Sequence, residues 1–324
     1  MPEAAAAFDG ELESMFTRPG EEGLSLAAVV MVSGDVVAER YGVQPDDLFQ
    51  PERAIDADTT LTSWSMAKSI THAAVGIAVE EGLIELEAPA AVPGWKGTDK
   101  ERITLLDLLE MRSGLHFVED YVDDSTSNCL EMLFGSGADD HAGYAAALPL
   151  EHPPGTVWNY ASGSTNIICR ILGEAVGGGE QGMRKFLTAR LFSPAGMASA
   201  DPVFDPAGTF VGSSYVYATA CDFARFGELY RNGGAAGGGR VLPEGWTDHA
   251  RHQIALDPET GFGYGRHWWT WPQYPGAFGA HGYEGQFCIV VPDRELVLVH
   301  LGKTTAELRP RLVERLHRLI ALAG

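Results

Sequence analysis

Strand-forming segments lie near both ends of this 324-residue chain, and helix-forming sequence fills most of the middle. The first segment, residues 26–42, contains two apolar runs joined by the turn sequence SGD, which predicts a β-hairpin. Near the other end, GQFCIVV and ELVLVHLG are joined by a tight turn at the sequence PDR. Because strands need partners, we expect both ends to contribute to one sheet, with a mainly helical region inserted between them.

This pattern predicts an α+β fold in which an antiparallel sheet is flanked by helices. The sheet region is assigned to residues 1–58 and 260–324, and the mainly helical region to residues 59–259. Regularly spaced leucines between Leu308 and Leu319 predict an amphipathic helix at the end of the chain. Thr304 and Glu307 fit a capping box at the start of that helix.

Charge and composition argue against several classes of partner. The formal net charge is −21 and the sequence pI is about 4.8, so the protein's field repels nucleic-acid backbones and anionic lipid surfaces. Residues 1–16 lack the basic and apolar segments of a signal peptide, and the four cysteines form no C-x-x-C pair. We therefore expect a cytoplasmic protein with buried, reduced thiols. Its oligomeric state is left open.

One lysine stands alone in an apolar segment. From Thr59 to Val79 the only permanently charged side chain is Lys68, and burial of an unpaired ammonium is costly. Ser65 lies three residues earlier, and positions three apart on a helix share a face, with Cβ atoms about 5–6 Å apart. A buried, neutral amine can take the proton of a serine that attacks a carbonyl. The alternative is a chance spacing, with Lys68 reaching out to a polar surface.

A tyrosine and a glycine-rich strand are candidates for the rest of such a site. Ser164 is expected to cap a helix that runs to Gly177, which places Tyr160 on the preceding loop. From there its hydroxyl can relay a proton to a leaving group, although a lone tyrosine also fits a surface position. The small residues of 276–285 allow a substrate to approach a strand edge, where an N–H opposite Ser65 would complete an oxyanion hole. The same glycines could equally mark a β-bulge.

Taken in order, these segments resemble the serine β-lactamase-like hydrolases. That family includes class C β-lactamases, D-alanyl-D-alanine carboxypeptidases, esterases and aminohexanoate-dimer hydrolases. Residues 65–68, SMAK, resemble its S-x-x-K element, and residues 160–162, YAS, resemble its Y-x-N/S element. The segment ITLLDLLEMRSGLHFVEDY resembles the family's LLtM-SGL segment, and its EDY stretch is most similar to the aminohexanoate-dimer hydrolase and esterase branch. The resemblance runs from about Leu24 to Lys303.

The resemblance implies a β-lactamase/transpeptidase-like serine hydrolase that cleaves a small-molecule ester or amide through an acyl-enzyme, with no metal or other cofactor. It implies Ser65 as the nucleophile, Lys68 as the base and Tyr160 as the proton relay, at the interface of the two regions. Whether Lys68 or Tyr160 accepts the first proton stays open. The backbone N–H groups of Ser65 and Tyr283 are the expected oxyanion donors, and a gapless alignment offers Ala280 in place of Tyr283.

Two departures from the family pattern bear on the substrate. The K-T-G element of the third strand has no lysine here, and residues 280–282, AHG, are its preferred match. Loss of that cation removes an anchor for a β-lactam carboxylate, which favours small esters or linear amides. Ser162 stands where penicillin-recognising members favour asparagine.

Four residues are candidate substrate contacts: Tyr121, Ser162, His281 and Gly282. Tyr121 could instead anchor a loop, and His281 could be a structural histidine of the strand. Trp268, Trp269 and Trp271 are expected to pack the sheet. The alternative function is a non-catalytic or slowly acylated binding or sensor protein on the same fold. The identity of the substrate is left open.

Overall fold

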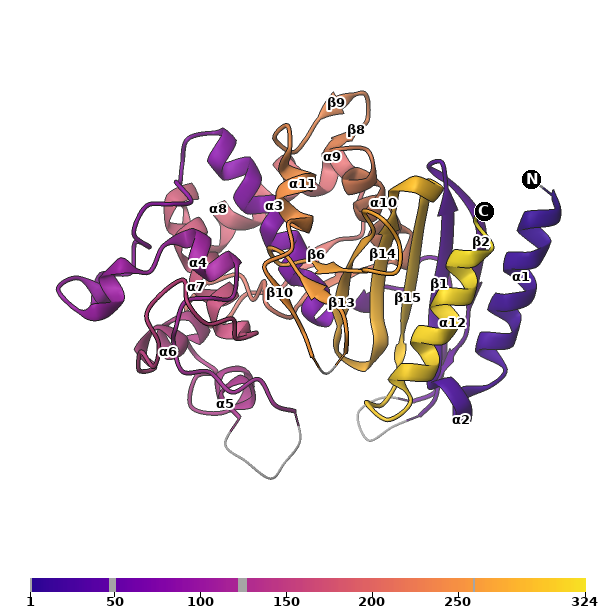
Figure 1. Ribbon diagram of the computed structural model, residues 1–324, viewed down its shortest axis with the longest axis horizontal. Helices are drawn as coiled ribbons and strands as arrows, with labels where there is room; N and C mark the ends of the chain where they lie inside the picture. Colours follow the sequence, from indigo (N-terminus) through magenta and orange to yellow (C-terminus); the bar gives the residue numbers. More distant parts are fainter. Residues whose placement is uncertain (1, 47–50, 122–126, 259) are drawn as a thin grey trace.

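The computed structural model describes residues 2–46, 51–121, 127–258 and 260–324. Within this part of the chain, an eight-stranded antiparallel sheet has the order β10-β11-β12-β13-β14-β15-β1-β2. Both ends of the chain contribute to it, as the sequence predicts, and the α+β fold class is confirmed (Figure 1). The strands are β1 (Leu24–Val32), β2 (Asp35–Tyr41), β10 (Ala255–Leu256), β11 (Gly263–Tyr264), β12 (Trp269–Thr270), β13 (Phe278–Gly282), β14 (Gln286–Val291) and β15 (Leu296–Lys303).

The turns of the sheet follow from local sequence. Ser33 and Gly34 have φ values of 52° and 87°, so the β1–β2 hairpin turns through two left-handed residues, as tight hairpins favour. The β14–β15 connection is a short 3-10 helix, η6 (Pro292–Arg294). At the other edge, β10 pairs with β11 and therefore extends the sheet before residue 260, where the sequence placed the boundary of the helical region.

The C-terminal helix α12 (Arg309–Ala321) begins later than the proposed capping box. The residue preceding it is Leu308, which makes no side-chain cap, and a proline lies in the first turn. The hydroxyl of Thr304 instead donates a hydrogen bond to the Glu22 carbonyl oxygen at 3.1 Å. The capping-box prediction is wrong because this hydroxyl links the end of β15 to the segment before β1.

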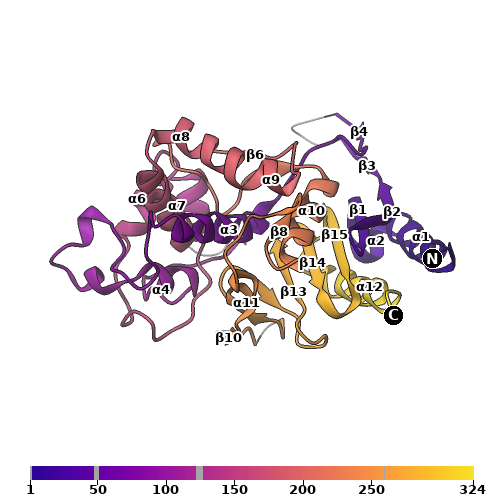
Figure 2. The ribbon, with the colours of Figure 1, turned by 90° about the horizontal axis from the view of Figure 1, so that it is seen from above.

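Helices cover both faces of the sheet. Figures 1 and 2 place α1 (Pro2–Phe16) and α12 together on the outer face, which also brings the two ends of the chain near one another. Helix α10 (Ala220–Arg231) packs against β14, β15 and β1 on the inner face. Alternate residues of β1 accordingly belong to different apolar clusters: Ala28 and Val30 face the outer helices, and Val29 and Met31 face inward.

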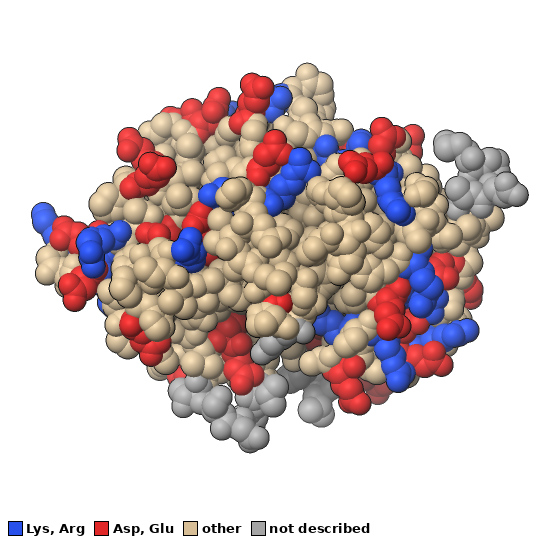
Figure 3. Space-filling view, in the orientation of Figure 1, with Lys and Arg blue, Asp and Glu red and all other residues tan. Residues whose placement is uncertain are grey.

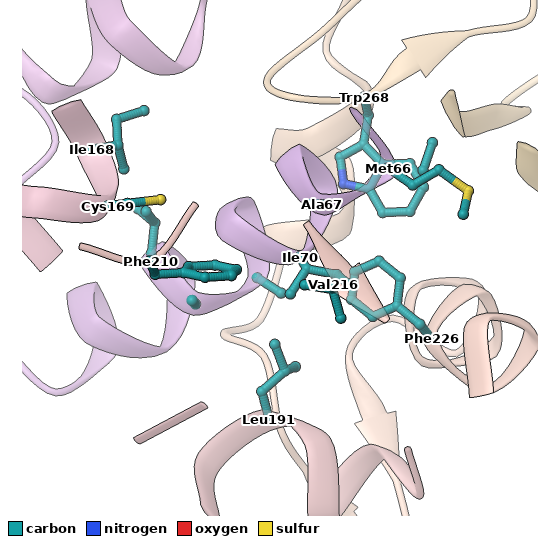
Figure 4. Close-up of a cluster of buried hydrophobic side chains, with 14 of the residues drawn as sticks. Met66, Ala67, Ile70, Ile168, Cys169, Leu191, Phe210, Val216, Phe226 and Trp268 are labelled. Carbon is teal, nitrogen blue, oxygen red and sulfur yellow. The ribbon is translucent and has the colours of Figure 1, made fainter. Parts of the chain in front are cut away.

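The helical region holds the helix that carries Lys68. Residues 67–78 of α3 (Ala67–Glu80) are all buried, so this helix has almost no solvated face. Figure 4 shows Ile70 of α3 among Leu191, Phe210 and Val216. Helix α3 packs against α7 (Ser162–Val176) and a π-helical segment, η4 (Leu187–Phe192). The other helices of this region are α4 (Leu105–Leu109), α5 (Asn128–Phe134), α6 (His141–Ala147), α8 (Gly179–Phe186) and α9 (Ser193–Ala195).

Short elements complete the described part of the chain. They are α2 (Pro19–Glu22), β3 (Val43–Gln44), β4 (Arg53–Ala54), β5 (Leu61–Thr62), η1 (Trp64–Met66), η2 (Pro93–Trp95), η3 (Asp99–Arg102), β6 (Asp201–Pro202), β7 (Val216–Ala218), β8 (Ala235–Ala236), β9 (Gly239–Arg240), α11 (Trp246–Arg251) and η5 (Tyr283–Gly285). On the face seen in Figure 3, Lys and Arg side chains lie beside Asp and Glu side chains rather than in a separate patch. No helix among the described residues is both long and apolar enough to cross a membrane.

A buried ion pair joins α2 to α12, and its removal should destabilise the fold. Arg315 and Glu22 are only 4% and 5% exposed, and Arg315 Nε lies 2.9 Å from Glu22 Oε2. Replacing Arg315 by Met leaves the buried carboxylate with only the half-exposed Arg318, 3.7 Å away, which should lower the free energy of unfolding by about 3 kcal/mol in urea denaturation. The exposed pair of Arg184 and Asp201 is the control, because Arg184→Met should cost about 1 kcal/mol or less. Equal losses in the two variants would contradict this account.

Buried histidines should make stability depend on pH. His300 donates from Nδ1 to the Gly285 carbonyl oxygen at 2.6 Å, and burial lowers its pKa to about 4. An unfolded histidine titrates near pH 6.5, so the unfolded state takes up a proton first as the pH falls. The stabilisation is therefore complete above pH 6.5 and is lost between pH 6.5 and 4. His300→Gln should flatten this decline in urea titrations, and an unchanged decline would argue against the assignment.

Candidate active site

Ser65 and Lys68 meet at the junction of two helices. Ser65 lies in η1, which runs directly into α3, and Lys68 is in the first turn of α3. Trp64, just before the serine, has a φ of 42°, a left-handed conformation that is costly for a bulky residue. Lys68 Nζ lies 2.9 Å from Ser65 Oγ. The spacing in the sequence therefore produces the direct contact that it predicts.

The Lys68 amine is buried and has three partners. Its side chain is 2% exposed, so it does not reach the surface. Besides Ser65 Oγ, Nζ contacts Ser162 Oγ at 2.9 Å and the Ser213 carbonyl oxygen at 2.8 Å. Three acceptors match the three N–H bonds of an ammonium, which compensates for its removal from water. Ser213 precedes β7, and no pattern in the sequence indicated its part in this cluster.

Tyr160 approaches the same pair from a separate loop. It precedes α7, which starts at Ser162 and therefore two residues earlier than the predicted cap at Ser164. Lys68 Nζ lies 4.9 Å from the centre of the Tyr160 ring. Burial raises the pKa of Tyr160, and the Lys68 charge and hydrogen bonding with Ser65 and Lys68 offset part of that rise. The phenol is thereby held in its protonated form beside the serine and the amine.

Two cavities open beside Ser65. The larger, of about 200 Å³, is lined by Ser65, Tyr121, Tyr160, Trp269, His281, Gly282, Tyr283, Glu284, Gly285, Thr304, Ala306 and Arg309. A second cavity of about 100 Å³ is lined by Ser65 and residues of α5, among them Leu130, Leu133 and Phe134. Ser65, Tyr121 and Tyr283 line both cavities, so a substrate bond held at Ser65 would have two spaces beside it.

The strand opposite Ser65 is β13, and the residue that follows it is Tyr283. Among the described residues, no backbone carbonyl from another segment accepts a hydrogen bond from the N–H of Ser65 or from the N–H of Tyr283. Ala280, the gapless alternative, lies inside β13 paired with Cys288 and does not line either cavity. Among the two candidates for the second oxyanion donor, the geometry favours Tyr283.

The remaining predicted contacts have different surroundings. Tyr121 lines both cavities, and its hydroxyl donates to Glu119 Oε1 at 2.5 Å, so it is both a loop anchor and part of the cavity wall. His281 accepts a hydrogen bond from Trp271 Nε1 at 2.9 Å, and burial lowers its pKa well below the usual value. Trp268 and Trp271 are fully buried, as expected, but Trp269 lines the larger cavity and stacks on His281.

Three charged residues near the site were not predicted. Glu119 contacts Ser162 through two hydrogen bonds; the EDY stretch that contains it carried only the resemblance to one branch of the family, with no role for the glutamate. Glu284 and Arg309 line the larger cavity; burial raises the pKa of Glu284, and burial lowers the pKa of Arg309. Because these residues come from a loop, a turn and the start of α12, no local spacing connects them to Ser65.

No group of three or more His, Cys, Asp or Glu among the described residues is arranged to hold a metal ion.

Comparisons with known proteins show the family and the fold of the chain. The family model described as Beta-lactamase matches residues 12–323. The 6-aminohexanoate-dimer hydrolase of Paenarthrobacter ureafaciens is 27% identical over 305 residues, which cover 87% of this chain and 73% of that protein. A structure described as "Putative 6-aminohexanoate-dimer hydrolase from Bacillus anthracis" superposes with a TM-score of 0.77 at 25% identity, covering 96% of this chain and 81% of that one. A family VIII carboxylesterase, at 16% identity and a TM-score of 0.69, covers 96% of this chain and 97% of its own and shares the fold.

Close packing at Gly282 should be needed for the site geometry. A Cβ atom at this position would lie 2.6 Å from the Ser63 carbonyl oxygen, so any side chain forces β13 away from η1. Gly282→Ala should therefore separate Tyr283 from Ser65 and lower kcat/KM for a nitrophenyl ester by about 10- to 100-fold. Gly173→Ala is the control, because a Cβ atom there meets nothing within 4 Å. Full activity in Gly282→Ala would show that this close approach is dispensable.

Proposed function

The chain belongs to the β-lactamase family, and on that basis we propose that it is a serine hydrolase that cleaves an amide or ester bond of a small molecule. In this proposal the acyl group is transferred to Ser65 and then to water. The single observation that carries it is the 2.9 Å contact between the Ser65 hydroxyl and the amine of Lys68, which is buried. A hydroxyl and an amine so placed are the nucleophile and the general base of acyl transfer.

The proposed reaction has two stages, acylation of Ser65 and hydrolysis of the acyl-enzyme. Ser65 Oγ attacks the carbonyl carbon while Lys68 accepts the hydroxyl proton, and the carbonyl oxygen becomes an oxyanion held by backbone N–H groups. The C–N or C–O bond of the substrate then breaks, and the departing amine or alkoxide takes up a proton through Tyr160. Water attacks the acyl-enzyme by the same route in reverse, which returns Ser65 to its hydroxyl form.

The environment of Tyr160 supports a division of roles. Burial raises its pKa, so near neutral pH the phenol is a proton donor rather than the first acceptor. This assigns the first proton transfer to Lys68 and the delivery of a proton to the leaving group to Tyr160. The sequence alone left open whether Lys68 or Tyr160 accepts the first proton.

Small linear esters and amides are the proposed substrates. The two cavities that meet at Ser65 measure only about 200 and 100 Å³, and Tyr121 and Tyr283 line both of them. Such a shape accommodates a short chain on each side of the bond to be cleaved. The similarity to proteins described as 6-aminohexanoate-dimer hydrolases favours a linear amide of this kind over a fused ring.

Labelling and turnover test the proposal together. The wild-type protein should add one fluorophosphonate group, detected by intact-mass spectrometry, and should hydrolyse nitrophenyl esters. Ser65→Ala should lose the label and at least about 10³-fold of kcat/KM while its thermal unfolding midpoint is retained. Ser136→Ala removes a surface hydroxyl and is the control.

The outcomes separate an enzyme from a binding protein. Turnover of nitrophenyl esters, linear amide oligomers or nitrocefin with Ser65-dependent labelling supports the hydrolase. Stable labelling of Ser65 without turnover of any of these would favour the binding or sensor function. Unreduced turnover in Ser65→Ala would contradict the assignment of the nucleophile.

A further inference from the structure

A carboxylate with no role in the proposed mechanism is linked to Lys68 through one serine hydroxyl. Glu119, on the loop between α4 and α5, accepts a hydrogen bond from Ser162 Oγ at 2.6 Å and another from the Ser162 N–H at 2.7 Å. Ser162 Oγ in turn lies 2.9 Å from Lys68 Nζ. A single hydroxyl group therefore connects the carboxylate to the amine.

The other groups around Glu119 are donors. Tyr121 donates to Oε1 at 2.5 Å, and the Cys129 thiol lies 3.6 Å from the same oxygen. Burial raises the pKa of both Tyr121 and Cys129, so each retains its hydrogen at neutral pH. Tyr160, Cys169 and His267 are the other titratable groups that sense the charge of Lys68. Burial raises the pKa of Tyr160 and Cys169 and lowers that of His267 to about 3, so all three are uncharged at neutral pH. Glu119 thus acts as an acceptor toward Ser162, Tyr121 and Cys129.

A count of hydrogens then fixes the direction of the bonds at Lys68. An ionised carboxylate only accepts, so the single hydrogen of the Ser162 hydroxyl points to Glu119 and Ser162 Oγ must accept from Lys68. The Ser213 carbonyl oxygen, 2.8 Å from Nζ, also only accepts. Both hydrogens of a neutral amine are therefore committed to Ser162 and Ser213. Its lone pair is left facing Ser65 Oγ, 2.9 Å away.

We propose that Glu119 is a positioning residue: by keeping the Ser162 hydroxyl as an acceptor, it directs the lone pair of neutral Lys68 toward the Ser65 hydroxyl. This inference rests on the proposed function of Ser65 and Lys68. After the proton has moved from Ser65 to Nζ, the ammonium finds all three acceptors already in place. The base therefore changes its protonation state without any rearrangement of its neighbours, which is the advantage of a preorganised site.

The variant Glu119→Gln should reverse this arrangement while preserving the shape of the side chain. Glutamine has one accepting oxygen, and the fixed Ser162 N–H donor claims it. The amide nitrogen then faces Ser162 Oγ and donates to it. The Ser162 hydrogen is freed to point at the lone pair of Lys68, where it competes with Ser65 for the base.

The expected result is a loss of rate that a second substitution restores. In pH profiles of kcat/KM for a nitrophenyl ester, Glu119→Gln should lower the plateau by about 10- to 100-fold, because the base is misdirected. Ser162→Ala, which has no hydroxyl to reverse, should lose no more than about tenfold. The double variant E119Q/S162A should regain the level of Ser162→Ala and therefore exceed Glu119→Gln. Glu131→Gln is the control, because Glu131 also accepts from the N–H and hydroxyl of one serine, Ser136, on the surface.

Each outcome supports or overturns the inference. Removal of a nearby negative charge is by itself expected to move the acidic limb of the profile to lower pH, so a shifted limb with an unchanged plateau would reduce Glu119 to a charge effect and overturn the proposal. Losses that multiply in the double variant would do the same, since they would show that Glu119 does not act through Ser162. Should Glu119→Gln prove too unstable to purify, a loss in Ser162→Ala as large as that in Lys68→Met would overturn it. Failure of the hydrolase proposal itself would appear separately, as turnover that persists in Ser65→Ala.

Discussion

The site depends on one buried amine and the groups that surround it. Lys68 is 2% exposed in the first turn of the buried helix α3, and its position is tolerable only because Ser65, Ser162 and Ser213 each supply an oxygen. These oxygens come from η1, α7 and the segment before β7. Elements far apart in the sequence must therefore be correctly packed before the amine is satisfied, which couples the integrity of the fold to the geometry of the proposed base.

The sheet contributes the opposite wall of the site. Because β13 pairs between β12 and β14, its C-terminal end is held against η1, and Gly282 allows the two backbones to approach closely. This contact brings Tyr283 to the same cavity as Ser65. The antiparallel sheet and the buried helix α3 thus meet at the proposed reaction centre, and the tyrosine of the loop before α7 closes it from a third side.

Local patterns in the sequence predicted the parts of the site that local spacing determines. Ser65 and Lys68 are three residues apart, so their contact follows from helix geometry. Short-range rules placed Tyr160 only on a loop before a helix, and the family resemblance implied its role beside Lys68. Glu119 escaped prediction because its contact with Ser162 spans 43 residues and depends on loop conformation. The capping-box prediction at Thr304 is wrong for a related reason. The spacing of Thr304 and Glu307 fits a capping box, but in the fold the Thr304 hydroxyl donates to the distant Glu22 carbonyl oxygen.

The most direct test of the account is the rate at which a fluorophosphonate labels Ser65 as a function of pH, measured by intact mass in the wild type and in Lys68→Met. Methionine fills a similar volume without a basic nitrogen, so the fold should persist while the serine loses its proton acceptor. The account predicts that labelling slows by about 10²-fold or more at every pH. Labelling of Lys68→Met at the wild-type rate would contradict the claim that the buried amine activates Ser65.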